Sequence, residues 1–265
     1  MTGTAPAARP LLEVRGLRVV FDGFTAVDGL DLTVAEGELR FLIGPNGAGK
    51  TTLIDVVTGL TRPAAGQVLF DGTELVGRRE HRIVRLGVGR TFQTSVVFER
   101  LSVVENVDLA AAFRLGLPRL LRVRRGVSGT VAEALERTGL TALADRPAGE
   151  LSHGQRQWLE IAMLLAQRPR LLLLDEPVAG MSRDERERTG ELLLEIARDH
   201  TVVVVEHDMA FLRSYARTVT VLHEGRVLTE GDVAQVQADP RVREVYLGRR
   251  GAGDEPAVPA GGEVG

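Results

Sequence analysis

The hydrophobic positions of this chain include short runs that are typical of buried strands. Strands that are covered on both faces of a parallel sheet have continuous apolar or β-branched sequences. Runs of this kind lie at residues 39–43, 171–174 and 201–205. Residues 11–21 and 30–34 instead alternate between apolar and polar side chains, which predicts strands with one buried face. Shorter strands beside glycine-containing turns are expected at residues 67–70, 219–222 and 226–228.

A helical period replaces the strand pattern in the middle of the chain, from about residue 95 to 168. Helices are expected there at residues 103–113, 130–138 and 153–167. The last of these places Trp158, Ile161, Ala162 and Leu165 on one apolar face. Residues 184–198 form a further amphipathic helix between two buried strands, which makes a βαβ unit. We therefore expect an α/β nucleotide-binding core that surrounds an inserted helical segment.

A glycine-rich loop follows the first buried run and precedes a helical stretch at residues 51–59. It reads Gly44-Pro-Asn-Gly-Ala-Gly-Lys-Thr51, and Lys50 is the one lysine in a chain whose other basic side chains, histidine apart, are all arginine. In such a loop, backbone N–H groups hold phosphates, the lysine reaches the β- and γ-phosphate oxygens, and a hydroxyl binds Mg²⁺. The loop predicts a nucleoside triphosphate site made of Gly44, Pro45, Asn46, Gly47, Ala48, Gly49, Lys50, Thr51 and Thr52.

Composition limits the remaining possibilities. The 265 residues are 44% hydrophobic and carry a net charge of −3, which is typical of a globular domain and argues against a nucleic-acid partner. The absence of cysteine excludes disulfides and thiolate metal sites and suits a reducing cytosol. The longest apolar run, 161–166, is too short to span a bilayer, so membrane association must come from a partner. Residues 1–10 lack the features of a signal peptide and are expected to be mobile, and residues 249–265 to be disordered.

Two further motifs narrow the class of nucleotide-binding protein to which the chain can belong. The segment Leu151-Ser-His-Gly-Gln155 lets Ser152 cap a helix whose N-terminus offers a second phosphate site. About 20 residues later, four leucines end in Asp175 and Glu176, which places two carboxylates at the carboxyl end of a parallel strand, beside the phosphate loop. Together with the phosphate loop, these motifs resemble those of ABC-type ATPases over residues 11–248. A kinase outside that family would lack the 151–155 segment.

The resemblance implies a fold and a set of roles. It implies an ABC-type P-loop ATPase core with an antiparallel β subdomain and an inserted α-helical subdomain at about 95–168. Glu176 would be the general base, His207 would contact the γ-phosphate, and Gln93 would reach the Mg²⁺ and join the subdomains. Mg²⁺ would be held with Thr51, Gln93 and Asp175, and Phe21 rather than Phe24 would stack on adenine, unless Phe21 is a core residue. Ser152, Gly154 and Gln155 would contact ATP bound to a second, head-to-tail ATPase subunit. Two positions depart from the usual pattern: His153 replaces a glycine, and Ser182 replaces an aspartate.

Three segments indicate a subgroup. Ala179-Gly-Met181, Glu206-His-Asp-Met209 and residues 242–248 resemble the ATP-binding subunits of branched-chain amino-acid importers, and within them the urea or short-amide branch most closely. The resemblance implies a peripheral subunit on the cytoplasmic membrane face that powers uptake through two permease subunits and is served indirectly by an extracytoplasmic solute-binding protein. The alternatives are uptake of branched-chain amino acids, or a cluster-assembly ATPase of similar size.

An arginine-rich segment stands apart from these motifs. Arg114, Arg119, Arg122, Arg124 and Arg125 alternate with leucines and have no nearby acid. This pattern favours a solvated basic insertion in the helical segment, and the alternative is contact with anionic lipid headgroups beside the permease.

Overall fold

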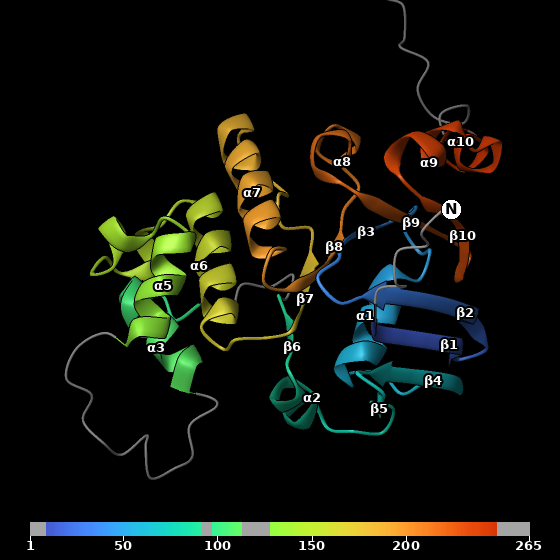
Figure 1. Cartoon of the computed structure of the whole chain (residues 1–265), viewed down its shortest axis with the longest axis horizontal. Helices are drawn as coiled ribbons and strands as arrows, with labels where there is room; N and C mark the ends of the chain where they lie inside the picture. Colours follow the sequence, from blue (N-terminus) through green and yellow to red (C-terminus); the bar gives the residue numbers. More distant parts are fainter. Residues whose placement is uncertain (1–8, 92–96, 113–127, 248–265) are drawn as a thin grey trace, which may run out of the picture.

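The computed structural model describes residues 9–91, 97–112 and 128–247. Its described residues form two sheets and a group of helices (Figure 1). The antiparallel sheet has the order β2-β1-β4-β5, and the larger, mainly parallel sheet has the order β10-β9-β3-β8-β7-β6. The strands are β1 (Pro10–Phe21), β2 (Phe24–Ala35), β3 (Leu39–Ile43), β4 (Ala65–Phe70), β5 (Thr73–Glu74), β6 (Val88–Arg90), β7 (Leu171–Asp175), β8 (Thr201–Val205), β9 (Thr218–His223) and β10 (Arg226–Gly231).

Some helices lie beside the sheets, and the helices α3, α5 and α6 form a separate group at the left of Figure 1. None of the described helices is long and apolar enough to cross a membrane. The helices are α1 (Lys50–Thr58), α2 (Glu80–Leu86), α3 (Val103–Ala112), α5 (Gly129–Arg137), α6 (His153–Leu165), α7 (Arg183–Ile196), α8 (Met209–Tyr215), α9 (Val233–Ala238) and α10 (Pro240–Leu247), with short 3-10 turns at Thr141–Leu143 and Ala148–Glu150.

The central strands separate two hydrophobic cores. Every residue of β3, β7 and β8 is buried, as the continuous apolar runs predict. Because side chains alternate between the two faces of a strand, Leu172 and Leu174 pack with the helices α6 and α7, whereas Leu171 and Leu173 pack with α1 and the antiparallel sheet. The sheet is therefore covered on both faces, and the carboxyl ends of its strands form one edge.

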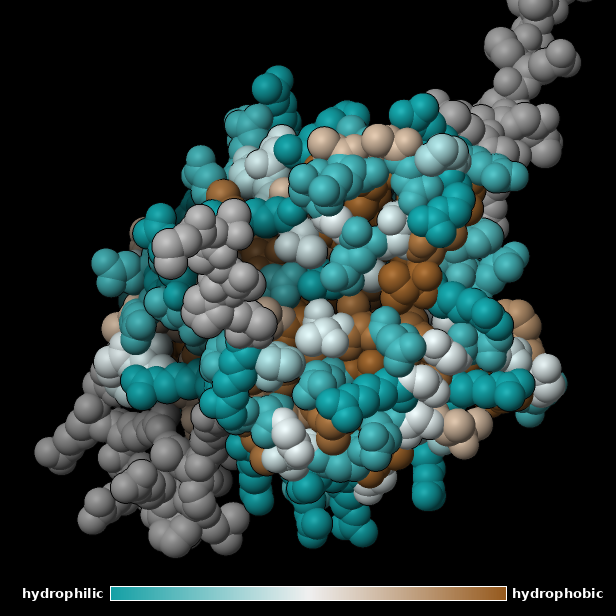
Figure 2. Space-filling view, turned by 45° about the vertical axis from the view of Figure 1, so that its right-hand side comes forward, coloured by the Kyte–Doolittle hydropathy of each residue, from teal (hydrophilic) through white to brown (hydrophobic). Residues whose placement is uncertain are grey.

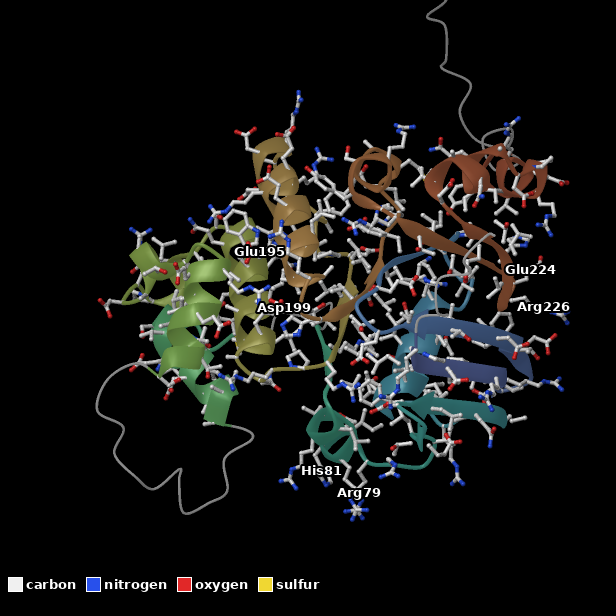
Figure 3. All side chains as sticks on the ribbon, in the orientation of Figure 1. Arg79, His81, Glu195, Asp199, Glu224 and Arg226 are labelled. Atoms are coloured by element: carbon white, nitrogen blue, oxygen red, sulfur yellow. The ribbon has the colours of Figure 1, made fainter. Side chains whose placement is uncertain are left out.

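Ion pairs join the outer parts of the molecule to this core. Arg137 of α5 pairs with Glu195 at 3.1 Å and with Asp199 at 3.3 Å, which ties the helical group to α7 (Figure 3). On the other side, Arg226 of β10 pairs with Asp28 of β2, and this pair lowers the pKa of Asp28. The face shown in Figure 2 is hydrophilic around its rim, with hydrophobic residues near its middle.

The structure agrees with the expected α/β core, antiparallel sheet and inserted helices, and it differs at several boundaries. The strand expected at 30–34 begins at Phe24, because β2 pairs with β1 as far as the turn at Asp22 and Gly23. The short elements β5, β6, α2, α8, α9 and α10 were not predicted. Residues 1–8, Gln93, the arginine segment 114–125 and the tail 249–265 lie outside the described residues.

Candidate active site

The phosphate loop lies between the buried strand β3 and helix α1, as its sequence predicts. At Gly44 the backbone has φ 153°, and a Cβ atom there would lie 2.2 Å from the carbonyl oxygen of Leu222. Only glycine fits this close approach of two backbone segments. The turn between β9 and β10 supports the loop from the same side, since the Gly225 N–H donates to the carbonyl of Ala48 at 3.1 Å. The loop is thus fixed by the neighbouring strand end.

Lys50 is folded into this loop. Its Nζ donates to the carbonyl oxygens of Gly44, at 2.7 Å, and Pro45, at 3.1 Å. Burial lowers the pKa of Lys50, and the carboxylates of Glu176 and Asp175 oppose that shift. No side chain caps the N-terminus of α1, and its first turn contains no acidic residue. The helix end therefore offers N–H groups and an ammonium to an anion.

The predicted carboxylates lie at the carboxyl end of β7. Asp175 is buried, and its backbone N–H donates to Thr91 Oγ1 at 3.1 Å. Its Oδ2 has no hydrogen-bond partner among the described residues and lies 3.7 Å from Arg90. Burial raises the pKa of Asp175, while Arg90 and Lys50 act in the opposite direction. A buried carboxylate oxygen in this state fits a hard cation, which would supply the missing partner.

This observation allows a test of whether Mg²⁺ fits the site. The donors offered by the chain, the hydroxyl of Thr51 and the carboxylate of Asp175, are the oxygen ligands that Mg²⁺ prefers. The described residues contain no group of three or more His, Cys, Asp or Glu side chains that could hold a metal ion. That agrees with Mg²⁺ at nucleotide sites, which is held by one or two protein groups together with water and substrate phosphates. The residues fit the ion.

Glu176 and His207 face each other across the sheet edge. Glu176 Oε1 lies 3.3 Å from His207 Nδ1, although the two residues are on different loops. The backbone of Glu176 has φ 50°, in the left-handed region, and its N–H donates to the carbonyl of Val205 at 2.9 Å. The carboxylate is thus held beside the histidine by a backbone conformation that is uncommon outside glycine.

The segment 151–155 forms a complete helix cap. Ser152 Oγ accepts from the N–H of Gln155 at 3.2 Å, and the Gln155 side chain accepts from the N–H of Ser152 at 3.0 Å. Gly154 is buried, and a Cβ atom there would lie 2.4 Å from Oε1 of Glu185. The neighbouring residue, His153, places its Nε2 2.9 Å from the carbonyl oxygen of Ala179, in the loop after Glu176.

The second departure from the usual pattern, Ser182, has a clear structural explanation. It caps α7 in the same way as Ser152 caps α6: its Oγ accepts from the N–H of Glu185 at 3.3 Å, and Glu185 accepts from the N–H of Ser182 at 2.9 Å. Serine and aspartate are both strong N-cap residues, so Ser182 keeps the helix start. Oε1 of Glu185 also lies 3.3 Å from Ser152 Oγ, which joins the two helix starts.

Not all predicted site residues lie together in one chain. Lys50, Asp175, Glu176 and His207 meet at the edge of the large sheet, whereas Ser152 lies at the start of α6, where its hydroxyl is 3.3 Å from Glu185 of α7. Phe21 and Phe24 flank the β1–β2 turn with 46% and 65% of their surface exposed, so neither is a core residue. The role of Phe21 in stacking on adenine stays a prediction.

Sequence reasoning missed two residues of this site. Arg90 forms an ion pair with Asp55 of α1 and approaches Asp175, so it connects the phosphate-loop helix to β7. Glu206 is buried and accepts backbone hydrogen bonds from the loops that carry Glu176 and His207. Of these two residues, only Glu206 could have been found from the sequence. It directly follows a run of β-branched residues, and a buried carboxylate there is costly unless hydrogen bonds or a cation satisfy it.

The fold and this edge of the sheet define a P-loop nucleotide hydrolase. The sequence model described as "ABC transporter" matches residues 27–179, and the one described as "Branched-chain amino acid ATP-binding cassette transporter" matches residues 226–252. The chain belongs to the ABC transporter family. It is accordingly an ATPase of the transport-coupled type, which binds ATP with Mg²⁺.

Individual relatives are similar to this protein in sequence over nearly the whole chain. The high-affinity branched-chain amino acid transport ATP-binding protein BraF of Pseudomonas aeruginosa is 39% identical over 252 residues, covering 91% of this chain and 99% of that protein. LivG of Escherichia coli K12, with the same description, is 36% identical over 91% of this chain and 99% of its own length. The crystal structure of an ATP-binding cassette of an ABC transporter in its ADP conformation has a TM-score of 0.80 and 30% identity, and covers 91% of this chain and 100% of that one. These matches confirm the predicted fold class.

Proposed function

We propose that this chain is the ATP-hydrolysing subunit of a solute importer and works on the cytoplasmic face of the membrane, bound to two permease subunits. The observation that carries the proposal is the meeting of Lys50, Asp175, Glu176 and His207 at one sheet edge while the second phosphate site lies elsewhere in the same chain. One nucleotide then needs two ATPase subunits, arranged head to tail. Each would present its Ser152 and Gly154 to ATP held by the other.

The chemistry assigned to the site is hydrolysis of the γ-phosphoryl group. Glu176 takes a proton from water as the water oxygen bonds to the γ-phosphorus and the bond to the bridging oxygen breaks, releasing ADP. His207, 3.3 Å from Glu176, orients that carboxylate and contacts the γ-phosphate. Lys50 neutralises the β- and γ-phosphate oxygens from inside the loop. Thr51, Asp175 and Gln93 would hold Mg²⁺, which would supply positive charge to the same oxygens.

The partner permease has a candidate docking surface. A cavity of about 310 Å³ lies between α2, α3 and α6, and Phe98 and Leu109 at its edge are 51% and 47% exposed. Its other lining residues are Val84, Arg90, Thr91, Ala110, Glu160, Met163, Leu164 and Gln167. We expect a short helix from the cytoplasmic side of a permease to bind here, because an apolar hollow of this kind suits the apolar face of a helix. Leu109→Asp should abolish co-purification with the permease, whereas Leu60→Asp, at a 46% exposed leucine elsewhere, should not.

The transported solute is proposed from lineage, that is, from the resemblance of this chain to related ATP-binding subunits. The relatives BraF and LivG are described as branched-chain amino acid transport proteins, which supports those amino acids as the solute. Urea or a short amide is the second candidate, and the segments 176–181 and 246–248 favour it by their resemblance to that branch. Both candidates share the same ATPase chemistry.

Uptake measurements in a deletion strain separate the two solutes. Labelled leucine and labelled urea are supplied at micromolar concentration to cells that lack this chain, and the deletion is complemented with the wild-type gene or with Glu176→Gln. Loss of leucine uptake that only the wild-type gene restores supports the branched-chain assignment. Loss of urea uptake with normal leucine uptake supports the second candidate. Normal uptake of both solutes, with normal levels of the co-purifying permease, contradicts both.

A further inference from the structure

Glu206 is a buried carboxylate that the proposed hydrolysis does not yet use. It directly follows β8, and only 1% of its surface is exposed. Its backbone N–H donates to the carbonyl of Leu42 at 3.3 Å, which places Glu206 against the end of β3. A charged group in this position is costly unless hydrogen bonds satisfy it, so its partners indicate its role.

Its two oxygens bind two different loops. Oε1 accepts from the backbone N–H of Val178, at 3.3 Å, in the loop that begins with Glu176. Oε2 accepts from the backbone N–H groups of His207, at 3.0 Å, and Asp208, at 3.3 Å. One oxygen thus holds the loop of the general base, and the other holds the loop of the histidine.

These hydrogen bonds explain why a carboxylate is tolerated there. Among the described residues, no arginine or lysine forms an ion pair with Glu206, and the His207 side chain acts to lower its pKa. Burial raises the pKa of Glu206, and the N–H groups of His207, Asp208 and Val178 oppose that shift. The carboxylate therefore depends on the N–H groups of the two loops for its hydrogen bonds. In return, it fixes the distance between the two loops.

The separation matters because the catalytic pair spans the same gap. Glu176 and His207 are 3.3 Å apart, and each lies within two residues of a backbone N–H that Glu206 binds. A displacement of about 1 Å at a reacting group can cost roughly 10²-fold in rate. We propose that Glu206 is a positioning residue, which fixes the loop of the general base at the correct distance from the loop of His207. The inference rests on the proposed ATP hydrolysis.

The variant that tests this inference is Glu206→Gln. A glutamine has one acceptor oxygen and one NH₂ group, so in either orientation it turns a donor toward the N–H groups of one loop. We expect kcat for ATP hydrolysis by the purified full-length chain to fall about 10- to 100-fold. The affinity for ATP should change less than about twofold, because the phosphate loop keeps its contacts. Glu38→Gln is the control: Glu38 is another largely buried carboxylate that accepts a backbone N–H, but it also pairs with Arg40 and lies at the opposite end of β3.

A second measurement separates positioning from a general loss of stability. If Glu206 acts only by placing Glu176, the double variant Glu206→Gln/Glu176→Gln should hydrolyse ATP no more slowly than Glu176→Gln alone. Additive losses, a kcat for Glu206→Gln within twofold of wild type, or a loss of ATP binding that parallels the loss of kcat would each overturn the inference. If Glu206→Gln does not fold, Glu206→Asp replaces it with the same expectations, because the shorter side chain cannot reach both loops.

The same assays distinguish failure of this inference from failure of the proposed function. A wild-type chain without ATPase activity, or a Glu176→Gln variant with normal activity, contradicts the proposed hydrolysis. A wild-type chain that hydrolyses ATP and a Glu176→Gln variant that does not, together with a fully active Glu206→Gln variant, contradict the positioning role alone.

Discussion

The N-termini of α1 and α6 are the two proposed phosphate sites, and they are built differently. The start of α1 has Gly49 as its cap, no side-chain capping bond and no acidic residue, and it carries Lys50. The start of α6 is capped by Ser152 and Gln155, which bond to each other's backbone N–H groups. The first end is open and cationic, and the second is already capped by its own side chains. In the proposed head-to-tail dimer, α1 binds a phosphate of the ATP held by its own chain, whereas α6 receives a phosphate of the ATP held by the partner.

The N-terminus of α7 shows how acidic residues make a helix start unsuitable for binding a phosphate. It has the same capping box, but its third residue is Glu185 rather than a glutamine, and Asp184 precedes it. The hydrogen bonds from Ser182 lower the pKa of Glu185, so this helix end is neutralised by its own carboxylate. Ser152 can donate its hydroxyl to Glu185 in the isolated chain, since the two are 3.3 Å apart. A partner's γ-phosphate would have to replace that acceptor.

The largest effect is expected from Lys50→Arg, which tests the open site. The ammonium of Lys50 reaches two carbonyl oxygens inside the loop, and a planar guanidinium does not fit that space. ATP binding, measured by titration calorimetry, should be abolished although the charge is kept. Arg198→Lys, a charge-preserving change at an exposed position, should bind ATP normally. Near-normal ATP binding by Lys50→Arg would contradict the role of this loop.

Glu176→Gln should leave both proposed phosphate sites intact but stop the hydrolysis of the ATP bound between them. Turnover is expected to fall by roughly 10²- to 10⁴-fold, the range for a lost general base. ATP binding should persist, so the head-to-tail dimer should accumulate and appear in size-exclusion chromatography with ATP but not with ADP. If the variant remains monomeric with bound ATP, the second site belongs to a different ATPase chain.

Ser152→Ala tests the capped site and has Ser182→Ala as its matched control. Each change removes the cap of one helix and should cost about 1 kcal/mol of stability, measured by thermal unfolding. Ser152→Ala should in addition weaken ATP-dependent dimerisation and lower turnover about 10-fold, the effect of about 1.4 kcal/mol of lost transition-state contact. Ser182→Ala should change turnover by less than about threefold. Equal effects of the two variants on turnover would show that α6 and α7 do not differ as argued.

The sequence predicts those parts of this arrangement that depend on local patterns. The strands β3, β7 and β8 are found because burial on both faces produces continuous apolar runs. The strand β6 is missed because Val88–Arg90 is only three residues long and, within the described residues, pairs only with β7. The phosphate loop and the cap at Ser152 have their own local signatures.

Contacts between segments that are far apart in sequence are not predictable in this way. Glu206 bonds to Val178, and His153 bonds to Ala179, over separations of 28 and 26 residues. Neither pair has a sequence pattern, because both depend on how the sheet edge brings loops together. The resemblance to a family supplied the roles of Glu176 and His207, but it could not supply the residue that holds them at 3.3 Å.

The smallest effect is expected from His153→Gly, which restores the usual residue of the segment and sharpens the comparison of α1 with α6. The imidazole Nε2 lies 2.9 Å from the carbonyl oxygen of Ala179, so His153 links the start of α6 to the loop after Glu176. Nothing comparable ties the start of α1 to that loop through a side-chain hydrogen bond within the described residues. One such bond contributes about 1 kcal/mol, and its loss should therefore change turnover less than about fivefold while ATP affinity stays constant. Trypsin cleavage near the start of α6 should become faster in the ATP-free chain, because the helical group is then held to the core by fewer contacts. An unchanged cleavage rate would show that the other contacts between the helical group and α7, among them the Arg137 ion pairs, hold the two parts together without His153. A lower ATP affinity would show that the start of α6 acts on the nucleotide of its own chain.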